Sequence, residues 1–280
     1  RVRRLTGAAK VGHGGTLDPL ATGVLPIALG EATKTVSYVL DGAKTYRFTV
    51  RWGEARATDD ADGEVTATSE VRPDADDIRR TLPRFLGEIE QVPPAFSAVK
   101  IGGRRAYYEL ARAEEAVELK PRRVRVDAIE LVEVPDRDHA TFEARCGKGT
   151  YMRSLARDLA RALGTYGHIA SLRRIAVGPF TEHDAIPLDS LEGLMHSGAF
   201  AERLLPVETA LDDIPALALA EAEAHLLRSG QAVPLFRASD RDRIGRVATG
   251  ETVCATSGGK PVALARLEHG RLRPVRVFNL

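Results

Sequence analysis

The chain has 280 residues, 44% hydrophobic and 28% charged, a composition typical of a globular protein with a sizeable core. Lysine and arginine number 40 against 39 acidic residues, so the formal net charge is +1. There is no run of about 18 apolar residues, which excludes a membrane-spanning helix. Two cysteines are too few for a disulfide framework or a cysteine-based zinc site, and the histidines lack metal-ligand spacing. We therefore expect a cytoplasmic protein without a bound metal.

The near-zero net charge conceals separate basic and acidic blocks. Eight bases and four acids lie in residues 100–125, seven and one in 145–174, and eight and three in 241–276. Acids predominate in residues 54–77 and 182–223. Most of the bases are arginine, which binds phosphate in a planar, bidentate manner. The blocks indicate a nucleic-acid partner, although a solvated arginine-rich surface explains them about equally well.

Hydrophobic periodicity predicts both helices and strands. Residues 45–52 alternate, with Tyr46, Phe48, Val50 and Trp52 on one face, as in a half-buried strand. The helices expected in chain order cover residues 31–40, 76–82, 150–163 and 219–228. The strands expected cover residues 45–52, 124–134, 141–146, 246–249, 252–255, 262–267 and 272–278.

The helix expected over residues 150–163 has the clearest signals. Thr150 can cap it, and Gly164 stands where a glycine commonly ends a helix. Arg153, Arg157 and Arg161 are four residues apart, which places a basic stripe on a face away from the apolar one.

The order of the elements predicts an α+β fold. Strands and helices do not alternate regularly, so a mixed or antiparallel sheet with flanking helices is favoured over a parallel α/β sheet. We assign this part to residues 1–212. Short strands separated by glycine and charged residues predict a small β-rich domain over residues 213–280.

Two glycine-rich segments fail as nucleotide-binding motifs. Gly12-His13-Gly14 begins like a dinucleotide fingerprint, but Leu17 occupies the position of the third glycine. The second segment, residues 146–150, ends like a phosphate-binding loop. However, Phe142 replaces the first glycine that such a loop requires.

Residues 12–34 contain the strongest candidate for chemistry. Asp18 lies in a turn bounded by glycine and proline and flanked by apolar residues. A carboxylate held in this way is partly desolvated and can act as a nucleophile or general base. Taken alone, however, an Asp-Pro in a glycine-rich turn is more often only a turn.

This segment resembles the catalytic motif of the TruB-type pseudouridine synthases, Gly-His-x-Gly-x-Leu-Asp-Pro-x-Ala-Thr-Gly. Residues 12–23 meet that pattern, and the match continues to Lys34. Further matches follow in the family's order at residues 44–46, 59–63, 91–94, 97–100, 147–153 and 172–174. An ordered set over about 170 residues is hardly a coincidence, whereas one motif could be.

The resemblance implies roles for particular residues. Asp18 corresponds to the catalytic aspartate, Arg153 to the arginine paired with it, and Tyr46 to the tyrosine that stacks on the target uracil and is a candidate base for the C5 proton. The implied substrate-binding residues are His13, Tyr151, Leu172, Lys34 and Asp60. Without the resemblance, Tyr46 and Leu172 would be read as core residues, and Arg153 as part of the basic stripe.

The resemblance also implies a reaction and partners. The expected reaction is isomerisation of uridine 55 in the T-loop of tRNA, by a monomer without cofactor, metal or obligatory protein partner. Residues 96–123 correspond to an insertion that closes over the T-arm and is expected to be ordered only with RNA. Residues 213–280 resemble a PUA-type RNA-binding domain, and a strand with a Lys-Pro-x-Gly segment is expected before Arg1. Two other functions stay open: a guide-RNA-dependent synthase, and an RNA-binding or tRNA-folding module in which catalysis is secondary.

Overall fold

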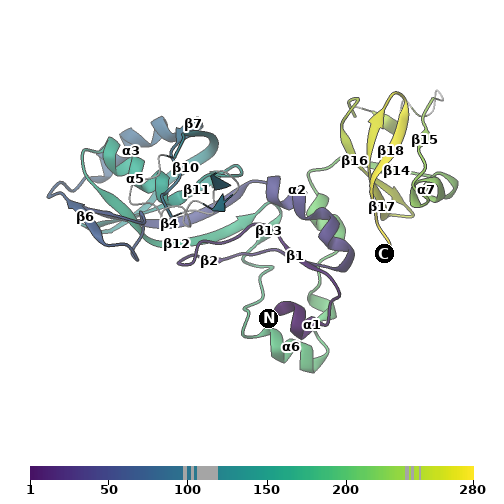
Figure 1. The fold of residues 1–280 in the computed structure, drawn as a ribbon, viewed down its shortest axis with the longest axis horizontal. Coiled ribbons are helices and arrows are strands. Elements are labelled where there is room, and N and C mark those ends of the chain that lie inside the picture. The colour runs from purple at the N-terminus through teal and green to yellow at the C-terminus, as the bar shows by residue number, and fades with distance from the viewer. Residues whose placement is uncertain (97–99, 102–103, 106–118, 237–239, 241–242, 246) are drawn as a thin grey trace. The chain divides into compact units, whose positions relative to one another are not determined.

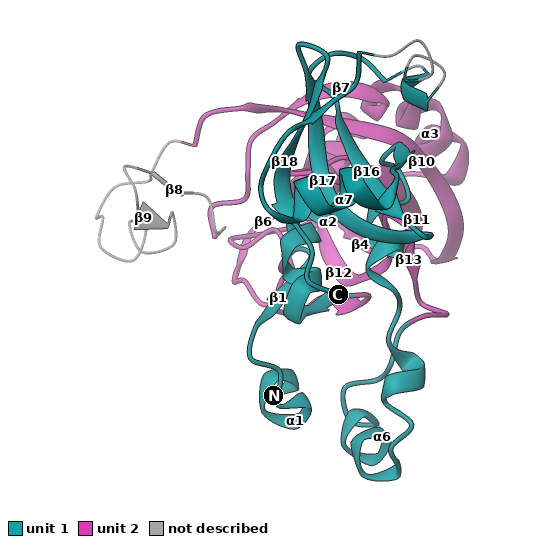
Figure 2. Cartoon of the chain, turned by 90° about the vertical axis from the view of Figure 1, so that its right-hand side faces the viewer, with its two compact units in different colours: residues 1–15, 25–40, 185–280 teal, residues 16–24, 41–184 magenta. Residues whose placement is uncertain are grey.

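The computed structural model describes residues 1–96, 100–101, 104–105, 119–236, 240, 243–245 and 247–280 (Figure 1). The chain divides into two compact units, which Figure 2 colours separately. The first unit comprises residues 1–15, 25–40 and 185–280, and the second comprises residues 16–24 and 41–184. The motif over residues 12–34 is therefore shared between the units. The predicted boundary near residue 212 stays a prediction.

A mixed sheet is the framework of the second unit. Its strands lie in the order β13-β12-β4-β11-β10-β7, and β2 pairs with β12 at the side. All of these pairings are antiparallel except that of β2 with β12, so the predicted mixed sheet is confirmed. The strand bounds are β2 Thr22–Gly23, β4 Lys44–Trp52, β7 Gly87–Gln91, β10 Arg122–Asp136, β11 His139–Cys146, β12 Gly167–Val177 and β13 Phe180–Thr181.

Alternation in the sequence sets the buried face of this sheet. Phe48, Val50 and Trp52 of β4 are at most 1% exposed, as the pattern predicts. Phe142 of β11 lies opposite Phe48, and their rings stack with centroids 5.4 Å apart. Trp52 meets Phe142 edge to face at 6.2 Å. The aromatic contacts fix the register of β4 against β11, because a one-residue slip would turn these rings to the other face.

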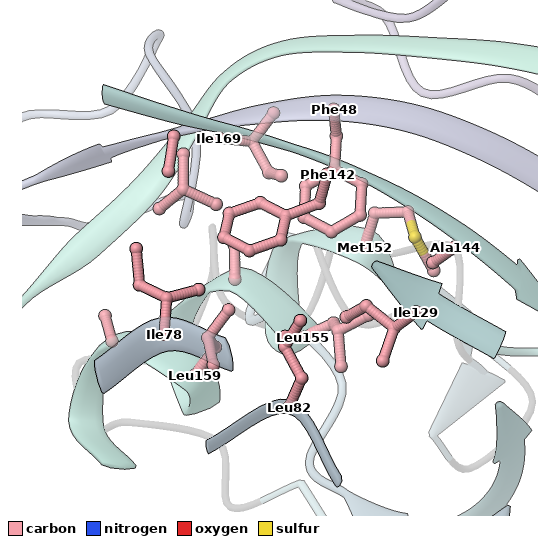
Figure 3. Close-up of a cluster of buried hydrophobic side chains, with 14 of the residues drawn as sticks. Phe48, Ile78, Leu82, Ile129, Phe142, Ala144, Met152, Leu155, Leu159 and Ile169 are labelled. Carbon is pink, nitrogen blue, oxygen red and sulfur yellow. The ribbon is translucent and has the colours of Figure 1, made fainter. Parts of the chain in front are cut away.

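Helix α5, Met152–Ala162, covers this aromatic face with its apolar stripe. Figure 3 shows Leu155 and Leu159 of α5 beside Phe142, with Ile78 of α3 (Ala75–Thr81) and Leu82 packed against the same cluster. The predicted helix is confirmed. The predicted Thr150 cap is wrong: Tyr151 is the N-cap residue, and the Thr150 hydroxyl donates to the Gly147 carbonyl at 3.1 Å.

The remaining elements before the C-terminal module are short. The helix predicted over residues 31–40 begins as a 3-10 segment, η1 Gly30–Thr35, and continues as α2 Val36–Asp41. Strand β1 Val11–His13 pairs with β3 Ile27–Leu29. The other helical elements are α1 Val2–Thr6, η2 Leu82–Phe85, α6 Leu191–Ser197, η3 Ala201–Arg203 and η4 Val207–Leu211. Two further strand pairs are β5 Glu54–Arg56 with β6 Val65–Thr68, and β8 Lys100–Ile101 with β9 Arg104–Arg105.

The predicted C-terminal β-rich module is confirmed. Its five strands lie in the order β14-β16-β17-β18-β15, and α7, Glu221–Arg228, packs on their aliphatic core. This curled sheet is consistent with a PUA-like domain. The strand bounds are β14 Ala216–Ala218, β15 Val233–Pro234, β16 Thr252–Ser257, β17 Lys260–Glu268 and β18 Arg271–Val277.

The strand predicted over residues 246–249 is wrong: residue 246 lies outside the described residues, and residues 247–249 belong to no strand, with the Val247 N–H donating to the Ile244 carbonyl. Most of the predicted insertion, residues 97–99, 102–103 and 106–118, lies outside the described residues. Among the helices that the structure describes, none has both the length and the apolar content that a membrane span requires.

Candidate active site

The loop that carries Asp18 is attached to the edge of strand β12. Thr22 and Gly23 pair with Arg173 and Arg174, and the Val24 N–H donates to the Arg174 carbonyl at 2.8 Å. Gly23 has φ +100°, and a Cβ there would lie 2.2 Å from the Arg174 carbonyl oxygen. Glycine is therefore required at this position, because no other residue allows the loop to approach the strand so closely.

Arg153 holds the carboxylate of Asp18. Its Nε donates to Asp18 Oδ2 at 2.9 Å, and the arginine side chain is 5% exposed against 30% for the aspartate. The other two nitrogens donate to main-chain carbonyls, Nη1 to Thr58 at 3.0 Å and Nη2 to Phe96 at 3.1 Å. The planar guanidinium is thus fixed on three sides, and it directs one donor at Asp18.

Residues 58–60 form the second support of Arg153. Asp60 Oδ2 lies 3.4 Å from Arg153 Nη1, and the Asp60 side chain is 6% exposed. Its other oxygen accepts hydrogen bonds from the Thr58 hydroxyl and, at 3.1 Å, from the Asp62 N–H. A single buried arginine therefore lies between two carboxylates, and Asp60 belongs to the same ionic network as Asp18.

Asp59 is turned the other way and pairs with Arg157. It has φ +59°, and its Oδ2 accepts a hydrogen bond from Arg157 Nη1 at 2.8 Å. Burial raises the pKa of Asp59, and the charge of Arg157 opposes that shift. Arg153 and Arg157 are therefore both engaged inside the protein, whereas Arg161 is 65% exposed. The predicted basic stripe is solvent-exposed only at its C-terminal end.

A pocket of about 100 Å³ opens beside the Asp18 carboxylate. Four of the predicted residues, Asp18, Tyr46, Tyr151 and Leu172, line it, and Arg153 reaches its edge through the hydrogen bond to Asp18. The full lining is Thr16, Leu17, Asp18, Ala21, Tyr46, Thr150, Tyr151, Met152 and Leu172. One carboxylate among aromatic and aliphatic side chains suits a flat, weakly polar ring such as a nucleobase.

Tyr46 lies on β4 opposite Arg174 of β12. Burial raises the pKa of Tyr46, and the charge and hydrogen bond of Arg174 oppose this shift. Arg174 is itself 1% exposed, and its Nε donates to the Val24 carbonyl at 2.8 Å. The Tyr46 phenol is consequently neutral near pH 7, and Arg174 links it to the end of the Asp18 loop.

His13 and Lys34 lie in the first unit. His13 ends strand β1 opposite Ile27 of β3. The Lys34 ammonium donates to Glu31 at 2.6 Å and to the Val277 carbonyl at 2.7 Å, which ties η1 to strand β18. Their predicted substrate-binding roles stay predictions.

Sequence reasoning assigned no role to several residues that support the site. Gln91 and Arg174 fall within matched motifs, yet neither has a side chain whose chemistry alone indicates a partner. Thr58 lies one position before the matched acidic segment. Only for Arg174 was there a signal, since a charged residue in the largely apolar end of a strand is buried only when it has partners.

The chain is similar to known proteins over its whole length. Residues 3–152 match the N-terminal domain of TruB family pseudouridylate synthases, and residues 153–212 match the C-terminal domain of tRNA pseudouridylate synthase B. A tRNA pseudouridine synthase B from Rhodospirillum rubrum is 58% identical, over 100% of this chain and 91% of the relative. One from Caulobacter vibrioides is 52% identical, over 100% of this chain and 90% of the relative.

A solved structure, the crystal structure of a Cbf5-Nop10-Gar1 complex, contains a chain with the same fold. It has a TM-score of 0.72 and 27% identity, and the match covers 96% of this chain and 73% of that one. The two family domains, the relatives and the shared fold all indicate the same family. The chain belongs to the TruB family of pseudouridylate synthases.

Proposed function

We propose that this protein converts uridine 55 in the T-loop of tRNA to pseudouridine, with Asp18 as the catalytic residue. The observation that carries the proposal is the Asp18–Arg153 hydrogen bond of 2.9 Å at the wall of a pocket that Tyr46, Tyr151 and Leu172 also line. The relatives named tRNA pseudouridine synthase B support tRNA as the substrate.

The reaction is an isomerisation that needs no oxidant and no second substrate. The bond between ribose C1′ and uracil N1 breaks, the base rotates, and C1′ bonds to C5. The proton on C5 leaves and N1 gains one, so atoms and charge balance. The Asp18 carboxylate can serve three routes: addition to uracil C6, attack on C1′, or elimination through a glycal. All three need an ionised carboxylate, which Arg153 orients and balances in charge.

The pocket also offsets part of the cost of flipping the target base out of the RNA stack. The target uridine has to leave the stack, which costs a few kcal/mol. Stacking on an aromatic ring returns about 1–3 kcal/mol per base, and Tyr46 presents such a ring in the pocket. Leu172 and Met152 supply the apolar surface that excludes water.

The charges suggest where the RNA backbone binds. Within residues 145–174, Arg153, Arg157 and Arg174 are used inside the protein. Lys148 and Arg161 are 63% and 65% exposed and remain accessible to phosphate. Affinity for tRNA should therefore fall with rising salt, and the slope of log affinity against log salt concentration should depend on the exposed lysines and arginines alone.

The test is to incubate the full chain with an unmodified tRNA transcript in the presence of a chelator and to map pseudouridine. Product at position 55 without added factors supports the proposal, and a transcript with cytidine at that position is the control. Product only with a guide RNA or protein partner would favour a guided synthase. Tight binding without product would favour the RNA-folding module.

A further inference from the structure

Gln91 places both ends of its carboxamide on the main chain of one pocket residue. It ends strand β7, and the residue is 2% exposed. Its Nε2 donates to the Tyr151 carbonyl at 3.1 Å, and the Tyr151 N–H donates to its Oε1 at 2.8 Å. A primary amide supplies a donor and an acceptor side by side, so Gln91 pairs with Tyr151 as a neighbouring strand would.

The backbone conformation of Tyr151 affects two side chains of the site. It is the N-cap residue of α5, at φ −100° and ψ 117°, and its own side chain makes no capping hydrogen bond. Its carbonyl also accepts the Leu155 N–H at 3.0 Å, the first hydrogen bond of the helix. The Tyr151 ring lines the pocket, and Arg153, two residues further on, holds Asp18. The backbone at Tyr151 therefore sets the direction of both side chains.

The residues after Gln91 attach the first turns of α5 in the same way. The Val92 carbonyl accepts hydrogen bonds from Ser154 Oγ and Arg157 Nη2, both at 2.8 Å. The Phe96 carbonyl accepts one from Arg153. Two buried prolines at positions 93 and 94 stiffen this segment, because each fixes φ. Gln91 contacts the α5 N-terminus through its side chain, whereas the contacts from Val92 and Phe96 use carbonyls that every residue has.

We propose that Gln91 is a positioning residue for pseudouridine formation, acting through the Tyr151 backbone on the Tyr151 ring and on Arg153. The proposal rests on the proposed function for its kinetic test. Glutamate at this position has the same shape but no amide donor, and it would turn a carboxylate oxygen toward the Tyr151 carbonyl. Methionine keeps the length and removes both hydrogen bonds.

The experiment compares Gln91→Glu and Gln91→Met with wild type in single-turnover assays on tRNA. A misplacement of about 1 Å can cost about 100-fold in rate. We expect a fall of that order in the rate of the chemical step, with the Kd for tRNA unchanged. Gln231→Met is the matched control, since Gln231 is the other glutamine of the chain and is exposed in the first unit. Ile78→Val, in the core cluster, controls for lost stability.

A second measurement does not depend on activity. In wild type the Tyr151 N–H should be protected from hydrogen exchange, and Gln91→Met should lose that protection while the amides of β4 keep theirs. A rate reduced no more than in Ile78→Val, or an unchanged exchange rate at Tyr151, would overturn the positioning role. If wild type forms no pseudouridine, the proposed function fails, and the exchange measurement still decides whether Gln91 holds Tyr151.

Discussion

The two largest sheets of this protein bury different kinds of side chain. The C-terminal sheet and α7 enclose a core cluster of aliphatic residues, among them Leu227, Val253 and Leu272 at 0% exposure. The core of the second unit also contains the aromatic side chains of Phe48, Trp52 and Phe142, and close to the pocket this unit buries Arg153 and Arg174. Burying a charge costs several kcal/mol unless hydrogen bonds and opposite charges offset it.

The difference indicates which region is organised for a reaction and not only for stability. A buried ion pair adds little stability compared with apolar side chains of the same size. The Asp18–Arg153–Asp60 network is therefore better explained by the need to orient a carboxylate than by stability. In the C-terminal module Arg243 also pairs with two carboxylates, Glu223 at 2.7 Å and Asp240 at 3.0 Å, but this arginine is 31% exposed against 5% for Arg153. The core under its sheet consists of aliphatic side chains.

The largest effect should come from Asp18→Asn. The amide keeps the size of the side chain but cannot act as a nucleophile or base, so turnover should fall by more than about 1,000-fold. Binding of tRNA and the folding transition should be retained, because the side chain is 30% exposed. Pseudouridine mapping and a gel-shift titration check this. Appreciable turnover by the variant would remove Asp18 from the mechanism.

Arg153→Met should lower both activity and stability. The change removes the positive charge that pairs with the buried Asp60 carboxylate and leaves two main-chain carbonyls without their arginine donor. Breaking a buried pair from one side costs about 3–5 kcal/mol. Urea unfolding measures the loss. The control is Arg161→Met on the same helix, 65% exposed, which should change stability by less than about 0.5 kcal/mol. Equal effects of the two changes would contradict the buried network.

Leu272→Ala tests the opposite side of the comparison. Leu272 is 0% exposed in the C-terminal core, and truncating such a leucine costs about 2–5 kcal/mol. The unfolding transition of the C-terminal module should shift, while the single-turnover rate on saturating T-arm RNA should stay at the wild-type value. A matching loss of the chemical step would mean that the two regions are not energetically separate.

The smallest effect concerns the titration of Tyr46. Burial raises the pKa of this phenol above its unfolded value of about 10, so its contribution to stability is complete below pH 10. It is lost as the pH rises from there through the folded pKa, by at most about 1.4 kcal/mol per pH unit. Urea unfolding of wild type and Tyr46→Phe between pH 9 and 11 measures the difference. Parallel pH profiles would contradict the buried, neutral phenol.

Several features could be predicted from the sequence because they depend on local periodicity. The alternation of β4 and the helical stripe of α5 each define a buried face, and both faces are found where the pattern places them. The family motif around Asp18 predicted a catalytic loop, and Asp18 lies in a pocket with Tyr46, Tyr151 and Leu172. Thr150 was wrongly predicted as the cap because the sequence could not show that its hydroxyl donates to the Gly147 carbonyl and that the helix begins after Tyr151.

By itself the sequence determined the fold class, the family and the candidate catalytic residues, since hydrophobic period and ordered motifs are properties of the chain alone. Only the tertiary structure decided which arginines are buried. Arg153, Arg157 and Arg161 are equivalent by spacing, yet their side chains are 5%, 15% and 65% exposed. The reason is physical: a guanidinium is buried only where carboxylates and carbonyls from distant segments meet it, and residues 18, 58–60 and 96 are brought together by folding.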